Sequence, residues 1–205
     1  MPASKAAIDS AMTMLAHTDA LIVDDRDNHG GDASSLHYLL SYFLRAPTQL
    51  TGIVKRTASG NRLFKAWSSI KVDGPKYIGK SIFVLTSIHT FSAGEAFAYD
   101  MKTLHRATLL GETTGGAANP GQFFSLDDHF SIFVPTGHAL NPFTQTNWEG
   151  VGVTPDVQIA AADALLAAYD RALLNSNDSF DTIVAQRTQA LKDPKAALEA
   201  SLPRI

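Results

Sequence analysis

The hydrophobic positions of this chain form two kinds of pattern, which alternate along most of its length. Short, continuous apolar runs indicate strands buried on both faces, and longer segments with apolar residues three or four positions apart indicate amphipathic helices. The predicted strands cover residues 20–23, 81–86 and 107–110. The predicted helices cover residues 5–16, 36–44, 92–105, 160–174 and 178–191.

Two further regions predict β-hairpins. Residues 49–57 and 62–72 flank a turn at Ser59–Gly60–Asn61, and residues 122–126 and 130–134 flank Asp127–Asp128. The aromatic residues of the second hairpin are expected to form its core, although they could instead line a cleft for an apolar ligand. Because strands alternate with helices and no repeat or linker interrupts them, we expect residues 1–205 to form a single α/β layered domain.

Composition narrows the functions open to this domain. Its 205 residues carry a net charge of -3 with scattered basic side chains, which argues against nucleic acid as a partner. There is no cysteine, so thiolate nucleophiles and thiolate metal sites are excluded. No metal-binding spacing and no apolar run of membrane-spanning length is present, and the first twenty residues lack the pattern of a signal peptide. We therefore expect no metal, no cofactor and no membrane span.

The junction between strand 81–86 and the helix after it carries the clearest candidate for chemistry. Ser92 lies where the apolar run has ended and the helix begins, so its hydroxyl could lie beside free backbone N–H groups that stabilise an anion. That arrangement suits a nucleophile next to an oxyanion hole. Ser92 and Glu95 also match the capping-box pattern S-x-x-E, so a purely structural role remains open at this point.

Four segments, taken together, resemble the S41 serine peptidases. This family includes the carboxy-terminal processing proteases, the tricorn core protease and the relatives of the interphotoreceptor retinoid-binding protein. The resemblance spans residues 20–158, so residues 159–205 are expected to add C-terminal helices, and it implies a ClpP/crotonase-like fold, a layered spiral of strands with crossing helices. The four segments are Leu21–Gly31 (strand, then D-x-R-x-N-x-G-G), Thr86–Glu95 (T-S-x-x-T-x-S-A-x-E), Arg106–Gly116 and Asn147–Val157.

The resemblance also implies roles for individual residues. Ser92 would attack a peptide carbonyl and form an acyl-enzyme. The N–H of Ala93 would be one oxyanion donor, and one of Gly30 and Gly31, with Gly31 favoured, would supply the other. Glu149 matches the glutamate that orients a histidine in the tricorn-like branch. The residues expected to line the substrate are Thr90, Thr114, Gly115 and Gly116.

The general base is missing from these matches. The lysine of the Ser–Lys branch would stand at Ala117, and no lysine lies between Lys102 and Lys192. The histidine of the tricorn-like branch belongs to a region before residue 20, where His17 is the single histidine and is expected in an exposed loop. His29 and His89 are expected at the rim of the site. The chain thus resembles a C-terminal catalytic core without the family's N-terminal region or a PDZ module.

The acidic turn after strand 20–23 has a structural interpretation. Asp24 and Arg26 are expected to tie the turn by an ion pair, whereas Asp25 departs from the resemblance, since an aliphatic residue is more usual there.

The leading hypothesis is a serine endopeptidase acting on peptide or protein substrates, with a homo-oligomer as a possible assembly. The alternative is a non-catalytic module of the same fold that binds apolar ligands or peptides.

Overall fold

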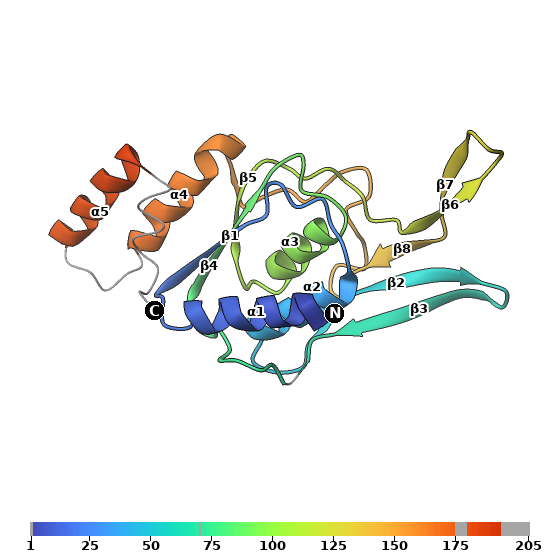
Figure 1. Ribbon diagram of the computed structural model, residues 1–205, viewed down its shortest axis with the longest axis horizontal. Coiled ribbons are helices and arrows are strands. Elements are labelled where there is room, and N and C mark those ends of the chain that lie inside the picture. Colours follow the sequence, from blue (N-terminus) through green and yellow to red (C-terminus); the bar gives the residue numbers. More distant parts are fainter. Residues whose placement is uncertain (1, 70, 175–179, 194–205) are drawn as a thin grey trace.

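A parallel sheet forms the centre of the fold. The computed structural model describes residues 2–69, 71–174 and 180–193 (Figure 1). In the sheet the order of strands is β1-β4-β5-β9, and every neighbouring pair is parallel. Five of the six residues of β4 are buried, which explains why its sequence shows no alternation of apolar and polar side chains. The strands are β1 (Ala20–Asp24), β4 (Ser81–Thr86), β5 (Thr108–Gly111) and β9 (Val157–Gln158).

Helices cover both faces of this sheet. Successive residues of β4 point to opposite faces, so Val84 belongs to one core with α1, α2 and α3, while Leu85 belongs to a second core with α4. Helix α5 lies against α4, where Arg187 forms an ion pair with Asp170. The helices are α1 (Pro2–Leu15), α2 (Ala33–Phe43), α3 (Ala93–Thr103), α4 (Ala161–Leu174) and α5 (Phe180–Lys192). Within the described residues, none of these helices combines the length and the apolar character needed to cross a bilayer.

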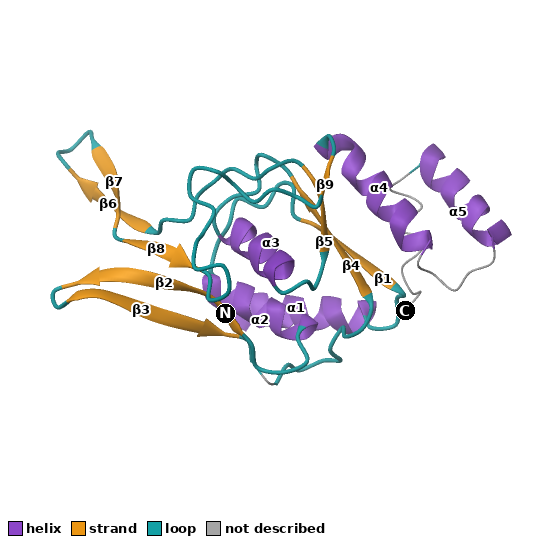
Figure 2. Cartoon of the chain, turned by 180° about the vertical axis from the view of Figure 1, so that it is seen from behind, coloured by secondary structure: helices purple, strands orange, loops and turns teal. Residues whose placement is uncertain are grey.

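Antiparallel strands extend at the end of the molecule opposite to α4 and α5, as both views show (Figure 1, Figure 2). One sheet has the order β3-β2-β8, and a separate hairpin pairs β6 with β7. Both hairpins were predicted, whereas β8 and β9 were not. Those two strands are four and two residues long, and only pairing with distant strands makes them extended. The strands are β2 (Gln49–Thr57), β3 (Gly60–Trp67), β6 (Gly121–Ser125), β7 (Ser131–Pro135) and β8 (Gly137–Leu140).

The aromatic side chains of the β6–β7 hairpin do not form a core. Phe123 is 74% exposed and Phe130 is 68% exposed, and Phe124, Ile132 and Phe133 are also exposed. The expectation of a buried hairpin is therefore wrong. The reason is visible in the fold, because none of the described helices packs against this hairpin and its two strands pair only with each other among the described strands (Figure 1).

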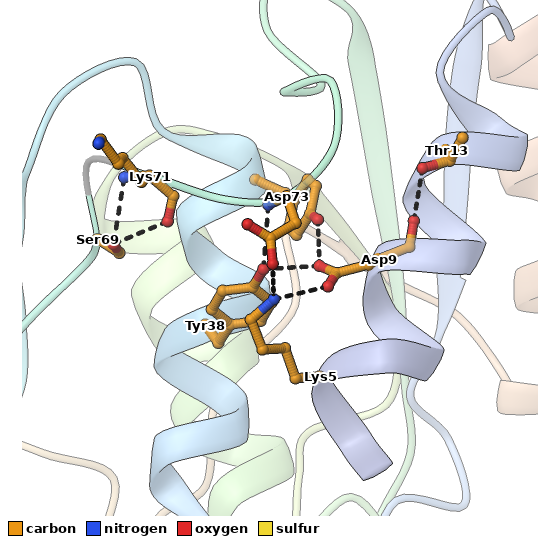
Figure 3. A network of polar contacts seen from close by, with 8 residues as sticks. Lys5, Asp9, Thr13, Tyr38, Ser69, Lys71 and Asp73 are labelled. Carbon is orange, nitrogen blue, oxygen red and sulfur yellow. Dashed lines mark hydrogen bonds and ion pairs between the residues drawn. The ribbon is translucent and has the colours of Figure 1, made fainter. Parts of the chain in front are cut away.

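A polar network fixes α1 against α2 (Figure 3). The Asp9 carboxylate accepts hydrogen bonds from Lys5 Nζ at 2.8 Å, from Tyr38 Oη at 2.6 Å and from Tyr42 Oη. Lys5 also pairs with Asp73. These donors, Lys5 first, lower the pKa of Asp9 to about 2. The network therefore holds in register two helices that also contribute walls to the cleft described below.

Candidate active site

Ser92 occupies a strained turn between β4 and α3. Its backbone has φ 53° and ψ −114°, a conformation that L-residues with a side chain rarely adopt. Strain of this kind costs about 1–3 kcal/mol and is found preferentially at functional sites. The residue is exposed although it follows a buried strand, so the turn presents the hydroxyl-bearing side chain at the surface.

Gly30 touches this turn, and only glycine fits there. A Cβ added to Gly30 would lie 2.8 Å from Ser92 Cβ and 2.9 Å from the amide nitrogen of Ala93, closer than real carbon atoms approach. Gly30 also has φ +101°. The two loops are joined by a hydrogen bond from the N–H of Phe91 to the carbonyl oxygen of Asn28, at 2.9 Å. The loop after β1 and the serine before α3 are therefore in contact through Gly30.

The hydrogen bonds around this contact distinguish the two glycines. The N–H of Gly30 donates to Asn28 Oδ1 at 2.9 Å, so that donor is occupied. Among the described residues, neither the N–H of Gly31 nor that of Ala93 donates a hydrogen bond to the protein. The amides of Gly31 and Ala93 are thus free of acceptors within the described protein, and both residues border the same cleft.

Glu95 does more than cap the helix. Its carboxylate is fully buried and accepts four hydrogen bonds: from the N–H of Ser92 at 2.9 Å, the hydroxyl of Thr114 at 2.5 Å, and the N–H groups of Gly116 at 2.6 Å and Ala117 at 2.7 Å. Sequence reasoning identified only the first of these contacts, as half of a capping box. Glu95 therefore joins the start of α3 to the loop that follows β5.

Thr90 and Thr114 are buried instead of lining an open surface. Thr90 Oγ1 donates to the carbonyl oxygen of Asp25 at 2.8 Å, and Thr114 Oγ1 accepts from the N–H of Val153 at 2.7 Å. Their hydroxyl groups are used inside the loops, which corrects the expectation that these side chains face a substrate. Gly115 is exposed beside them, and its N–H donates to the carbonyl oxygen of Thr90 at 3.0 Å.

Glu149 lies next to the same loop. Its Oε2 accepts from the N–H of Ala118 at 2.6 Å, and the neighbouring Gly150 donates its N–H to the carbonyl oxygen of Gly116 at 2.9 Å. No histidine in the described part of the chain hydrogen-bonds to Glu149. The carboxylate of Glu149 therefore binds a backbone amide. Glu149 binds the N–H of Ala118, and Glu95 binds the N–H of the preceding residue, Ala117.

Two imidazoles lie beside each other near the serine turn. His29 immediately precedes Gly30, His89 lies three residues before Ser92, and their ring centroids are 6.5 Å apart. Both are exposed, as is His17. No group of three or more metal-ligating side chains is found in the described ranges.

A cleft of about 630 Å³ opens where β1, α1, α2 and α3 meet beside this turn. Gly30, Gly31 and Ala93 form part of its wall. Its apolar lining consists of Ile8, Val23, Leu36, Leu39 and Phe97, and its acidic lining consists of Asp24, Asp25, Asp27 and Asp32.

Asp25 is the unusual member of this lining, and sequence reasoning noted it only as a departure. It is 3% exposed, its Oδ1 accepts from Asn28 Nδ2 at 2.7 Å, and its Oδ2 has no partner. Burial raises the pKa of this carboxyl to about 7. By contrast, Asp24 forms the expected ion pair with Arg26 at 2.6 Å.

Comparison with solved structures shows where this fold occurs. The photosystem II D1 C-terminal processing protease is 24% identical in sequence and superposes with a TM-score of 0.61. The match covers 78% of this chain and 40% of the processing protease. Mature CPAF is 16% identical, with a TM-score of 0.63 over 80% of this chain and 43% of its own. A candidate peptidase from Parabacteroides merdae ATCC 43184 is 22% identical, with a TM-score of 0.70 over 86% of this chain and 59% of its own.

These likenesses confirm the expected fold of an S41 protease core, and the chain spans only about half the length of the proteins it matches. The family model for peptidase family S41 matches residues 2–159, which is most of the chain and contains all four of the segments singled out in its sequence. The chain belongs to peptidase family S41.

Proposed function

We propose that this chain is the catalytic core of a serine endopeptidase in which Ser92 is the nucleophile. The observation that carries the proposal is an exposed, strained serine that contacts Gly30 and lies beside a cleft lined by two residues with free amides, Gly31 and Ala93. Attack by Ser92 Oγ on a peptide carbonyl would place the developing oxyanion between these two N–H groups. Loss of one such donor typically costs about 3–4 kcal/mol of transition-state stabilisation.

The hydrogen bonds of Asn28 support the assignment of Gly31 as the second donor. Asn28 occupies the N–H of Gly30 with its side chain and binds the N–H of Phe91 with its carbonyl oxygen. Gly30 then serves as the residue without a side chain that lets the two loops touch, and Gly31 supplies the donor. Asn28 is thereby a positioning residue for both loops.

Glu95 supports the proposal from the opposite side of the turn. It fixes the N–H of Ser92 and the backbone of residues 116–117, the segment where the Ser–Lys branch would carry its lysine. Since Ala117 stands there, we propose that an imidazole takes the proton from Ser92. His29 precedes Gly30, which touches this turn, and His89 lies three residues before Ser92, so these two imidazoles are the candidates. All seven histidines of the sequence lie among the described residues and none of them hydrogen-bonds to Glu149, so Glu149 orients no histidine of this chain in the structure.

A serine-directed fluorophosphonate probe tests the nucleophile. We expect the chain to be labelled at Ser92, Ser92→Ala to be unlabelled, and Ser59→Ala, a change in the exposed β2–β3 turn, to be labelled like the parent. Peptide mapping by mass spectrometry identifies the modified residue. Equal labelling of the parent and Ser92→Ala would remove the assignment, as would a complete lack of labelling in both.

The alternative function, binding of apolar ligands, depended on the aromatic residues of the β6–β7 hairpin. None of those residues is among the residues that line the cleft, and their rings are exposed. The hairpin aromatics therefore do not line the described cleft beside Ser92.

A further inference from the structure

The cleft beside Ser92 combines an apolar wall with an acidic one. Leu36, Leu39 and Phe97 offer aliphatic and aromatic surface, while four aspartates contribute to the remaining lining. No lysine, arginine or histidine is among the lining residues in the described part of the chain. A ligand with an apolar stem and a positively charged end would match both parts of this surface.

The aspartates differ in how far the protein already satisfies them. Arg26 binds both oxygens of Asp24, with Nε at 2.8 Å and Nη2 at 2.6 Å, so that charge is compensated. Asp32 accepts from the N–H of Ser35 at the start of α2. Asp27 is exposed to solvent, whereas Asp25 is 3% exposed and its Oδ2 has no partner among the described residues.

A buried carboxylate oxygen without a donor is unfavourable. An ammonium or guanidinium group that enters the cleft would supply the missing N–H donor and would favour the ionised form of this carboxyl group. The unpaired oxygen thus points to a cationic ligand independently of the acidic composition of the wall. A neutral apolar ligand would leave Asp25 unsatisfied.

The position of the cleft identifies which part of a peptide would enter it. Gly31 and Ala93, the two proposed oxyanion donors, line the cleft themselves. A carbonyl bound between their amides would therefore carry its own residue's side chain at the mouth of the cleft. The volume of about 630 Å³ accommodates one long side chain, and falls within the range of ordinary ligand sites.

We propose that this cleft binds the lysine or arginine side chain of the residue on the acyl side of the scissile bond, with the alkyl stem against Leu36, Leu39 and Phe97 and the cationic end at Asp25. The proposal rests on the proposed function of Ser92 for the identification of the peptide residue. The chemistry of the cleft itself does not depend on catalysis.

Peptidyl diphenyl phosphonates test the preference directly. One probe carries a lysine side chain and the other carries norleucine, which has the same stem without the ammonium group. We expect Ser92 to react at least about tenfold faster with the lysine probe. Asp25→Asn should abolish this preference, whereas Asp128→Asn, which removes a charge from the β6–β7 turn, should retain it.

A binding measurement tests the cleft without requiring reaction at the serine. In the Ser92→Ala protein, NMR titration with n-pentylamine should shift signals of Leu36 and Leu39 and give at least about tenfold tighter binding than n-pentanol. Asp25→Asn should remove the difference. If the Asp25→Asn protein does not fold, a second variant replaces it. Asp27→Asn changes an exposed aspartate of the same wall and should reduce the difference in affinity between n-pentylamine and n-pentanol.

The two experiments separate the possible failures. If both phosphonates label Ser92 at equal rates, or norleucine reacts faster, the basic specificity is overturned while the peptidase proposal stands. If neither labels Ser92, the peptidase proposal fails, and the amine titration still decides the cleft: selective binding that depends on Asp25 supports a cation site, and equal binding of amine and alcohol overturns it.

Discussion

At the scale of single residues, Ser92 has a backbone conformation that glycine would adopt more readily. Its φ of 53° lies in the left-handed half of conformational space, and its Cβ lies against Gly30, where the two loops touch. A purely structural helix start gains nothing from such strain. The conformation is therefore the residue-level reason for treating Ser92 as more than a cap.

Because the backbone of Ser92 is strained, a residue that relieves the strain should stabilise the fold while removing the proposed nucleophile. Ser92→Gly relieves the unfavourable φ and should raise the free energy of unfolding by about 1 kcal/mol relative to Ser92→Ala, which keeps a Cβ in the same conformation. Urea unfolding of the two variants measures this difference. A glycine variant no more stable than the alanine variant would show that the turn is unstrained.

At the scale of elements, one buried carboxylate joins α3 to the loop after β5. Each carboxylate oxygen of Glu95 accepts two hydrogen bonds. Three of the four donors are backbone N–H groups, and the fourth is the hydroxyl of Thr114. The N–H of Gly115 adds a further bond between the same loop and the segment before the helix, to the carbonyl oxygen of Thr90 at 3.0 Å. The loop geometry of the candidate site thus depends on a residue that does not face the cleft.

Glu95→Gln should therefore be almost as harmful as Glu95→Ala. The amide nitrogen of glutamine would meet two donors in either orientation, so we expect a loss of about 3 kcal/mol or more in the free energy of unfolding. Glu149→Gln is the matched control, because an amide oxygen can replace the single contact of Glu149 with Ala118, and a loss below about 1 kcal/mol is expected there. Similar losses in both variants, measured by urea unfolding, would contradict this account.

At the scale of the whole molecule, buried and partnered carboxyl groups give opposite pH dependences. Partner donors lower the pKa values of Asp9 and Asp32 to about 2, so these groups add stability as pH rises from 2 to 4. Burial raises the pKa of Asp25 to about 7 and that of Asp100, which accepts hydrogen bonds from Thr51, to about 6. For these two carboxyl groups the unfolded chain loses the proton at a lower pH than the folded protein does. The free energy of unfolding therefore falls as pH rises from about 4 to 7.

We accordingly expect the free energy of unfolding to be greatest between about pH 4 and 5 and to decline toward pH 7. The double variant Asp25→Asn/Asp100→Asn should show a weaker decline, because neither replacement ionises. Urea unfolding across this pH range measures the profile, with Asp128→Asn as the charge-matched control. A stability that climbs steadily to pH 7, or a decline unchanged in the double variant, would refute the expectation.

Much of this architecture follows from local patterns. The apolar run at 81–86 coincides with β4, the helical spacing after Ser92 predicted α3, and the glycine pair after the first strand marked the loop that meets the serine. Such features are readable because periodicity and turn chemistry act over a few neighbouring residues. The sequence also contained the motifs that indicated the S41 family.

Tertiary structure alone decided the features that join distant segments. The short strands β8 and β9 exist through pairing, and Glu95 meets a loop about twenty residues away. The β6–β7 aromatics remain exposed because their hairpin pairs with no other described strand. The same holds for Asp25, which is hydrogen-bonded to Leu85 and Thr90 from a distant segment and whose buried Oδ2 has no partner among the described residues. Desolvation and hydrogen-bond satisfaction are set by whichever groups the fold brings together, and no local pattern records those partners.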